Sequence, residues 1–108
     1  MVVMCVLILV RFTYSRRAEC LMQPYQAMVK RGATERDIRA HSGIPQAVVV
    51  GPRGLRDWMR NYPPTERTPP FRGRALIYYL GSPGMDSDVV YVFLTPQGRA
   101  FAVVRGAG

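Results

Sequence analysis

The sequence predicts an α+β domain in which an N-terminal strand and two helices precede an antiparallel β-meander. Three observations lead to this fold class: an apolar run at the N-terminus, a middle region with helical spacing of apolar residues, and later β-branched runs separated by turn residues. The chain has 108 residues, of which 48% are hydrophobic, and this suits one domain with its own core. We therefore expect a single domain over residues 1–108.

The N-terminal strand is predicted from residues 1–10, which are all apolar. Such a run is typical of a strand buried on both faces, and we expect it to continue to about Tyr14. It is shorter than the roughly 20 residues that span a bilayer. It also lacks the basic start and the small-residue cleavage site of a signal peptide. A cytoplasmic location without a membrane partner is the expectation.

Two helices are predicted next. Ser15 can cap the first, which Pro24 either kinks or divides and which Gly32 ends. The sequence Thr34-Glu35-Arg36-Asp37 is a capping box, and it predicts a short second helix that stops at Ser42-Gly43. The apolar stripe of the first helix is Ala18, Leu21, Met22, Tyr25, Met28 and Val29.

The residue pattern in the second half of the chain indicates mainly strands, loops and turns. Residues 53–61 suit a helix or a strand equally, and the prolines in 61–70 predict a loop. The segment 95–98 predicts a tight turn with Pro96 and Gly98. The expected strands are residues 74–80, 89–94 and 100–104, with a polar hairpin loop at 81–88, and residues 48–50 are expected to be extended.

The charge balance favours anionic partners. Fifteen Lys and Arg residues oppose seven Asp and Glu residues, for a net charge of +8. Residues 11–74 carry the whole excess, with thirteen cations and five acids. All cations except Lys30 are arginine, which pairs bidentately with phosphate, but a GC-rich coding sequence produces the same bias. Both explanations of the arginine content stay open.

Metal and disulfide chemistry are not expected. Cys5 and Cys20 lack the spacing of a zinc site or of a disulfide framework, and we expect both to be buried thiols. His41 has no second histidine or cysteine beside it. We give it little weight as a catalytic base, and no cofactor is implied.

A DNA-binding regulator is one alternative. Residues 34–50 imitate a helix-turn-helix, with a capped helix, a turn at Gly43 and a recognition helix that would start near Pro45 and contain Gln46. Two features oppose it. Arg39 occupies the position where a small residue usually lets the two helices pack, and Gly51-Pro52 would end the recognition helix early.

The stretch 49–80 carries a resemblance. An apolar pair and a glycine-rich turn lead into Gly54-Leu55-Arg56, and Arg72-Gly73-Arg74 leads into the strand Leu76-Ile77-Tyr78-Tyr79. With the order of elements, this resembles the RelE/ParE superfamily of bacterial toxins, and most closely its HigB-like branch. The chain departs from that pattern at Asp57 and Ala75, which replace basic residues. The basic C-terminal motif is also missing, and Arg99 is the nearest substitute.

The resemblance implies the toxin of a type II toxin–antitoxin system, a metal-independent ribonuclease that cuts messenger RNA on the ribosome. Its partners would be a cognate antitoxin, messenger RNA and the ribosome, with DNA contacted only through the antitoxin. Such cleavage needs cations beside the phosphate and groups for proton transfer. The implied catalytic residues are Arg56, Arg74, Tyr78 and Arg99, and the implied RNA-binding residues are Arg53, Arg60, Arg72 and Tyr79. A basic binding protein without catalysis and the gyrase-directed activity of the ParE side remain alternatives.

Overall fold

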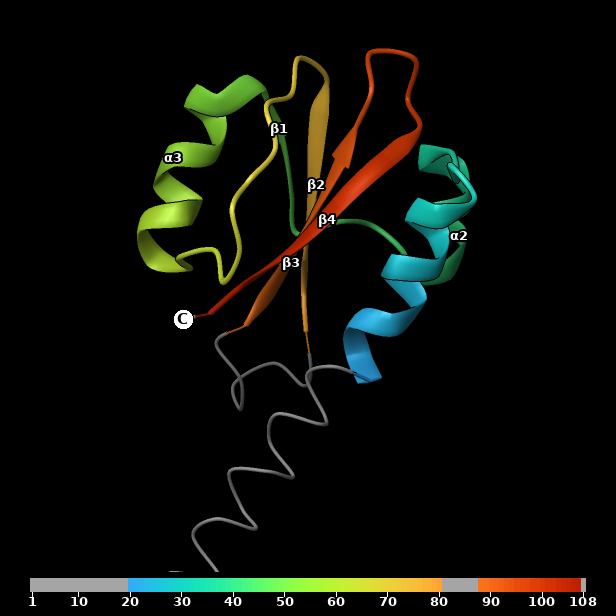
Figure 1. Ribbon diagram of the computed structural model, residues 1–108, viewed down its shortest axis with the longest axis horizontal. Coiled ribbons are helices and arrows are strands. Elements are labelled where there is room, and N and C mark those ends of the chain that lie inside the picture. Colours follow the sequence, from blue (N-terminus) through green and yellow to red (C-terminus); the bar gives the residue numbers. More distant parts are fainter. Residues whose placement is uncertain (1–19, 81–87, 108) are drawn as a thin grey trace, which may run out of the picture.

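The chain folds as an α+β domain around one antiparallel sheet (Figure 1). The computed structural model describes residues 20–80 and 88–107. The predicted N-terminal strand, the Ser15 cap and residues 81–87 of the predicted hairpin loop lie outside this range. Residues 20–30 are helical. The later elements are α2 (Glu35–Ser42), β1 (Ala47–Val50), α3 (Gly51–Asn61), β2 (Arg74–Tyr79), β3 (Val89–Leu94) and β4 (Ala100–Gly106).

The sheet confirms the predicted antiparallel meander and extends it. Its strand order is β1-β2-β3-β4, and each strand pairs antiparallel with the next. The predicted turn at 95–98 is confirmed, because the Gly98 amide donates to the Thr95 carbonyl at 2.8 Å. β4 continues to Gly106 and is therefore longer than predicted. The meander thus gains a fourth strand, β1, at its edge.

The order of elements differs from the prediction at α3. Residues 51–61 form a helix between β1 and β2, so the helices do not all precede the sheet. Gly51 has φ +70° and turns the chain out of β1. Pro52 lies in the first helical turn, where backbone N–H groups have no partner within the helix, so the N–H that proline lacks costs no hydrogen bond. The glycine-rich turn of the family resemblance is therefore the start of a helix.

The helix-turn-helix prediction is wrong in its second half. α2 and its capping box are present, with the Asp37 amide bonded to the Thr34 hydroxyl at 3.3 Å. The residues that would form the recognition helix instead form β1, where Val48 pairs with Leu76 of β2. Three successive β-branched residues and a strand partner favour the extended backbone there.

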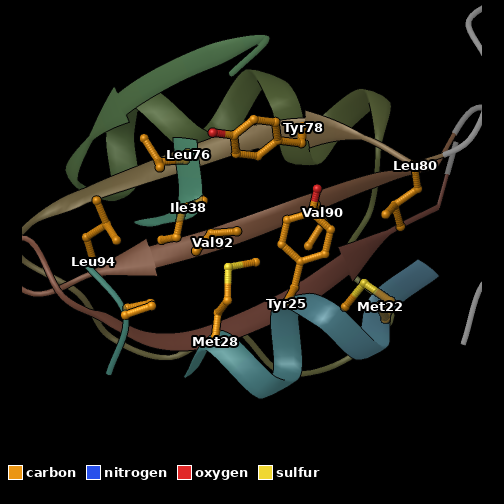
Figure 2. Close-up of a cluster of buried hydrophobic side chains, with 12 residues drawn as sticks. Met22, Tyr25, Met28, Ile38, Leu76, Tyr78, Leu80, Val90, Val92 and Leu94 are labelled. Carbon is orange, nitrogen blue, oxygen red and sulfur yellow. The ribbon is translucent and has the colours of Figure 1, made fainter. Parts of the chain in front are cut away.

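The helix over residues 20–30 and α2 cover one face of the sheet. Figure 2 shows Met22, Tyr25 and Met28 directed at the strands, where they meet Leu76, Tyr78 and their neighbours on β3. The predicted apolar stripe is thus confirmed for the residues in this range. The helix runs across Pro24 without a break, so it does not divide there. This packing forms the first of two cores.

α3 covers the opposite face of the sheet, as Figure 1 shows. Its Leu55 is buried against Ala75 and Ile77 of β2. Because side chains alternate along a strand, residues 75, 77 and 79 of β2 belong to the α3 face. Residues 74, 76 and 78 belong to the α2 face. This alternation decides which candidate residues can meet.

The cysteines, the helix lengths and the arrangement of possible metal ligands can be compared with the expectations from the sequence. Cys20 is exposed, so the expectation of a buried thiol is wrong for it, while Cys5 lies outside the described residues. No helix in residues 20–80 or 88–107 is long and apolar enough to cross a membrane. Within the same ranges, no group of three or more His, Cys, Asp or Glu residues is arranged to hold a metal ion.

Candidate functional site

Three of the four implied catalytic residues lie on the α2 face and are engaged there. Arg74 makes an ion pair with Glu35 of α2 at 3.0 Å. The Arg99 guanidinium donates to the Gly32 carbonyl at 3.3 Å. These contacts tie both arginines to the segment around α2. Their guanidinium groups therefore have structural partners on this face.

Tyr78 is the third of these residues, and it belongs to the core (Figure 2). It is only 5% exposed, and its hydroxyl donates to the Gly43 carbonyl at 3.0 Å. Burial raises the pKa of Tyr78, against a smaller opposing effect of Arg39. The phenol therefore stays protonated at neutral pH and is already committed as a donor, which does not suit a proton acceptor in catalysis.

Arg56, the fourth implied catalytic residue, lies on α3 and is exposed. The sheet stands between α3 and α2 (Figure 1). Arg56 and Arg74 therefore point to opposite faces, and the structure does not bring the four implied catalytic residues into one site.

The implied RNA-binding residues, in contrast, gather on the α3 face. Arg53 and Arg60 are exposed on α3 beside Arg56, and Tyr79 projects from β2 on the same face. None of these three arginines makes an ion pair within the part of the chain that the structure describes. We call Arg53, Arg56 and Arg60 the arginine row.

The two faces differ in charge. On the α2 face, Glu35 contacts both Arg39 and Arg74, and Asp37 sits at the N-terminus of α2, where a hydrogen bond from the Thr34 backbone lowers its pKa. α3 carries the arginine row against Asp57 alone. Exposed cations also lie outside α3, at Lys30, Arg31 and Arg36, so α3 is one of the surfaces that offer positive potential to an anionic partner.

An aromatic pocket lies beside the C-terminal half of α3. The rings of Trp58 and Tyr62 stack at 5.8 Å, and Tyr62 meets the edge of Tyr79 at 6.4 Å. Hydrogen bonding with Tyr79, together with burial, raises the pKa of Tyr62, so its hydroxyl is neutral at pH 7. The pocket encloses about 270 Å³ and is lined by Asp57, Trp58, Asn61, Tyr62 and Tyr79.

Tyr91 of β3 holds the aromatic pocket in place. Its hydroxyl donates to the Tyr62 carbonyl at 2.8 Å, which fixes the C-terminal end of α3 over the sheet. Burial, with a smaller contribution from Tyr62, raises the pKa of Tyr91 to about 12. The bond therefore persists through the whole neutral range.

This bond predicts a specific loss of stability at alkaline pH. The pKa of Tyr91 is about 12 in the folded chain against 10.0 for a free phenol, so its contribution is complete below about pH 10 and is lost as the pH rises toward 12. Its full size is no more than about 3 kcal/mol. Tyr91→Phe should be less stable than wild type at pH 8 by about 1 kcal/mol. That difference should shrink as the pH approaches 11, measured by urea unfolding, whereas a constant difference would contradict the assignment.

A second concave surface, the proline cleft, lies beside the N-terminal end of α3. It encloses about 600 Å³ and is lined mainly by apolar side chains, with Arg72 as its charged member. Phe101 is 37% exposed in it. Its lining residues are Pro52, Pro70, Phe71, Arg72, Leu94, Thr95, Pro96 and Phe101.

The α3 face thus combines the proline cleft, the arginine row and the aromatic pocket. α3 has 11 residues and spans about 16 Å between the two concave surfaces. Sequence reasoning missed Trp58, Tyr62 and Asn61, although the spacing of Trp58 and Tyr62 by four residues is a helical signal. Searches among protein-family models, curated proteins and solved structures found no match to this chain.

Proposed function

We propose that the α3 face binds single-stranded RNA. The observation that carries this proposal is the arginine row between two concave surfaces lined by aromatic rings. Arginine pairs with phosphate oxygens, and exposed rings stack on bases that are not already stacked in a duplex. This combination favours a single strand, because a duplex offers its phosphates but hides the faces of its bases.

The more specific proposal is the toxin of a type II toxin–antitoxin system, acting in the cytoplasm on messenger RNA at the ribosome. It is supported by the resemblance of residues 49–80 to RelE/ParE toxins and by the excess of positive charge on α3. An antitoxin with an acidic segment would neutralise the toxin by covering the arginine row.

Cleavage on the α3 face would use a reduced set of residues. The arginine row would stabilise charge on the phosphate oxygens. Among the implied catalytic and RNA-binding residues, Tyr79 is the one on this face with a hydroxyl for proton transfer. A protein that binds RNA without cutting it is the second candidate, and the separation of Arg56 from Arg74, Tyr78 and Arg99 favours it.

A binding measurement and a cleavage measurement test the two parts. A fluorescently labelled single-stranded RNA should bind more tightly than the same sequence as a duplex, measured by anisotropy. Equal or tighter binding of the duplex would refute the use of ring stacking. Primer extension on a message from a cell-free translation reaction, with and without ribosomes, then tests cleavage. Cuts that require ribosomes support the toxin proposal, and an uncut message bound by the protein supports the second candidate.

A further inference from the structure

The rim of the aromatic pocket carries two polar side chains that the RNA-binding proposal does not use. Asp57 and Asn61 both line the pocket, and they lie four residues apart on α3. Residues at this spacing are neighbours on one helix face, with about 5–6 Å between their Cβ atoms. Asp57 makes no ion pair within residues 20–80 and 88–107. Its two carboxylate oxygens are therefore free to accept from a ligand.

The pocket is small and opens to solvent. Sites for drug-sized ligands usually enclose about 300–1,000 Å³, and this one encloses about 270 Å³. Its rings offer stacking contact. Asp57 at its rim lies four residues after Arg53 and three before Arg60, so these side chains are neighbours on the surface of α3. A base that stacks on these rings beside Asp57 would therefore have its phosphate near the arginines of α3.

The polar rim discriminates between bases. The Watson–Crick edge of guanine presents two adjacent donors, N1–H and N2–H, next to the O6 acceptor. A carboxylate accepts two hydrogen bonds side by side, and an asparagine amide donates through its NH₂ group. Adenine, cytosine and uracil each place at least one acceptor where the carboxylate would need a donor. Guanine is therefore the base that matches Asp57 and Asn61 together.

From this match we infer that the aromatic pocket binds an unstacked guanine base of the RNA strand. Asp57 accepts from N1–H and N2–H, Asn61 donates to O6, and the rings of Trp58, Tyr62 and Tyr79 provide the stacking surface. The inference rests on the proposed RNA binding and adds a base preference to it.

An organic cation is the competing ligand, because aromatic rings beside a carboxylate also bind ammonium and guanidinium groups. The charge around the pocket disfavours this reading. Arg53 and Arg60 lie four residues before and three residues after Asp57 on α3, and they repel a cation while attracting the phosphate of a nucleotide. Binding of guanine accounts both for the polar side chains at the rim and for the arginines beside them.

The chain offers a direct reporter, because Trp58 is its only tryptophan. Titration with GMP, AMP, CMP and UMP should quench Trp58 fluorescence in a saturable way, with GMP binding about tenfold more tightly than the others. IMP, which lacks the N2 amino group, should bind more weakly than GMP. Equal affinities for the four nucleotides overturn the inference. Tighter binding of arginine or tetramethylammonium than of GMP also overturns the inference.

Asp57→Asn is the decisive variant, since its side chain is exposed and its loss should leave the fold intact. It should lower the affinity for GMP about tenfold. It should leave UMP binding unchanged or slightly tighter, because a negative charge near the phosphate is gone. Glu66→Gln, an exposed acid outside the pocket, is the matched control and should change neither affinity. An unchanged preference for GMP in Asp57→Asn would refute the role of the carboxylate.

A uridine-only RNA separates this inference from the proposed function. If that RNA binds while the four nucleotides show no preference for GMP, RNA binding stands and the guanine pocket is refuted. If GMP is preferred while no single-stranded RNA binds, the pocket stands and the proposed function fails.

Discussion

Alanine at Arg53, Arg56 and Arg60 together should weaken the binding of single-stranded RNA about 3- to 150-fold. The three side chains are exposed and lie on one helix. An exposed charge pair contributes about 0.2–1 kcal/mol, so the loss of three contacts amounts to about 0.6–3 kcal/mol. Anisotropy with a labelled oligoribonucleotide measures this directly. Circular dichroism should show an unchanged fold, because the buried Leu55 still anchors α3.

The salt dependence gives a second, independent readout of the same variant. Each phosphate contact on a single strand contributes about 0.7 to the slope of log affinity against log salt. Removal of three contacts should therefore lower that slope by about 2. A loss of affinity with an unchanged slope would show that the arginine row does not contact phosphates.

A matched control separates a local contact from the effect of total charge. Lys30, Arg31 and Arg36 are exposed cations outside the α3 face, and their replacement by alanine removes the same charge. This second triple variant should bind RNA with nearly wild-type affinity at physiological salt, where charges far from the RNA are largely screened. Equal losses in the two variants would mean that net charge attracts RNA without a defined face.

Local sequence signals predicted those parts of the fold that local physics determines. The capping box at Thr34 and Asp37 forms because hydroxyl and carboxylate satisfy free backbone amides at a helix start. The runs 74–80 and 89–94 form paired strands, because their residues are apolar on both faces and each face meets a core. In these segments the local preference and the tertiary structure agree.

α3 could not be assigned from the sequence, because its local signals conflict. Gly51, Pro52 and Gly54 are typical of turns and therefore do not indicate a helix. Nevertheless α3 starts here, and Pro52 is tolerated because it lies in the first turn. Tertiary packing resolves the conflict, since Leu55 and Trp58 gain contact with the α3 face of the sheet. The burial of this stripe outweighs the weak helix propensity of the first turn.

The grouping of candidate residues depended on a fact that no local pattern contains. The alternation along β2 implies that Arg74 and Tyr78 share one face and that Tyr79 lies on the other. Which face α3 covers depends on the path of the chain after β1. Implied RNA-binding residues therefore came together in the structure, whereas Arg56 was separated from the other implied catalytic residues.

The largest expected effect on stability comes from Gly73→Ala. Gly73 is buried between Arg72 and Arg74, and a Cβ atom there would clash with the Leu94 carbonyl oxygen and would lie 2.8 Å from the Thr95 carbonyl. These obstacles are backbone atoms of the β3–β4 connection, which cannot turn aside as a side chain can. The start of β2 must move instead, at a cost of about 2–3 kcal/mol, as for other overpacked sites.

The displacement should also reach the candidate site. The Gly73 carbonyl accepts from the Gly51 amide at 3.2 Å, which connects the start of α3 to the start of β2. Arg72, Leu94 and Thr95 all line the proline cleft. A shift of Gly73 should therefore alter the cleft, while the aromatic pocket at the other end of α3 keeps its shape.

Urea unfolding and nucleotide binding separate these two consequences. Gly73→Ala should lower the free energy of unfolding by about 2–3 kcal/mol, whereas Gly98→Ala should lower it by about 1 kcal/mol. Gly98 has φ +81° but open space around its Cβ position, so backbone strain alone acts there. In the absence of urea, and at a temperature where both variants are folded, GMP should still quench the fluorescence of Trp58 in each variant. If Gly73→Ala abolished that quenching, the two concave surfaces would be coupled through α3, and the cleft and pocket would have to be treated as a single site.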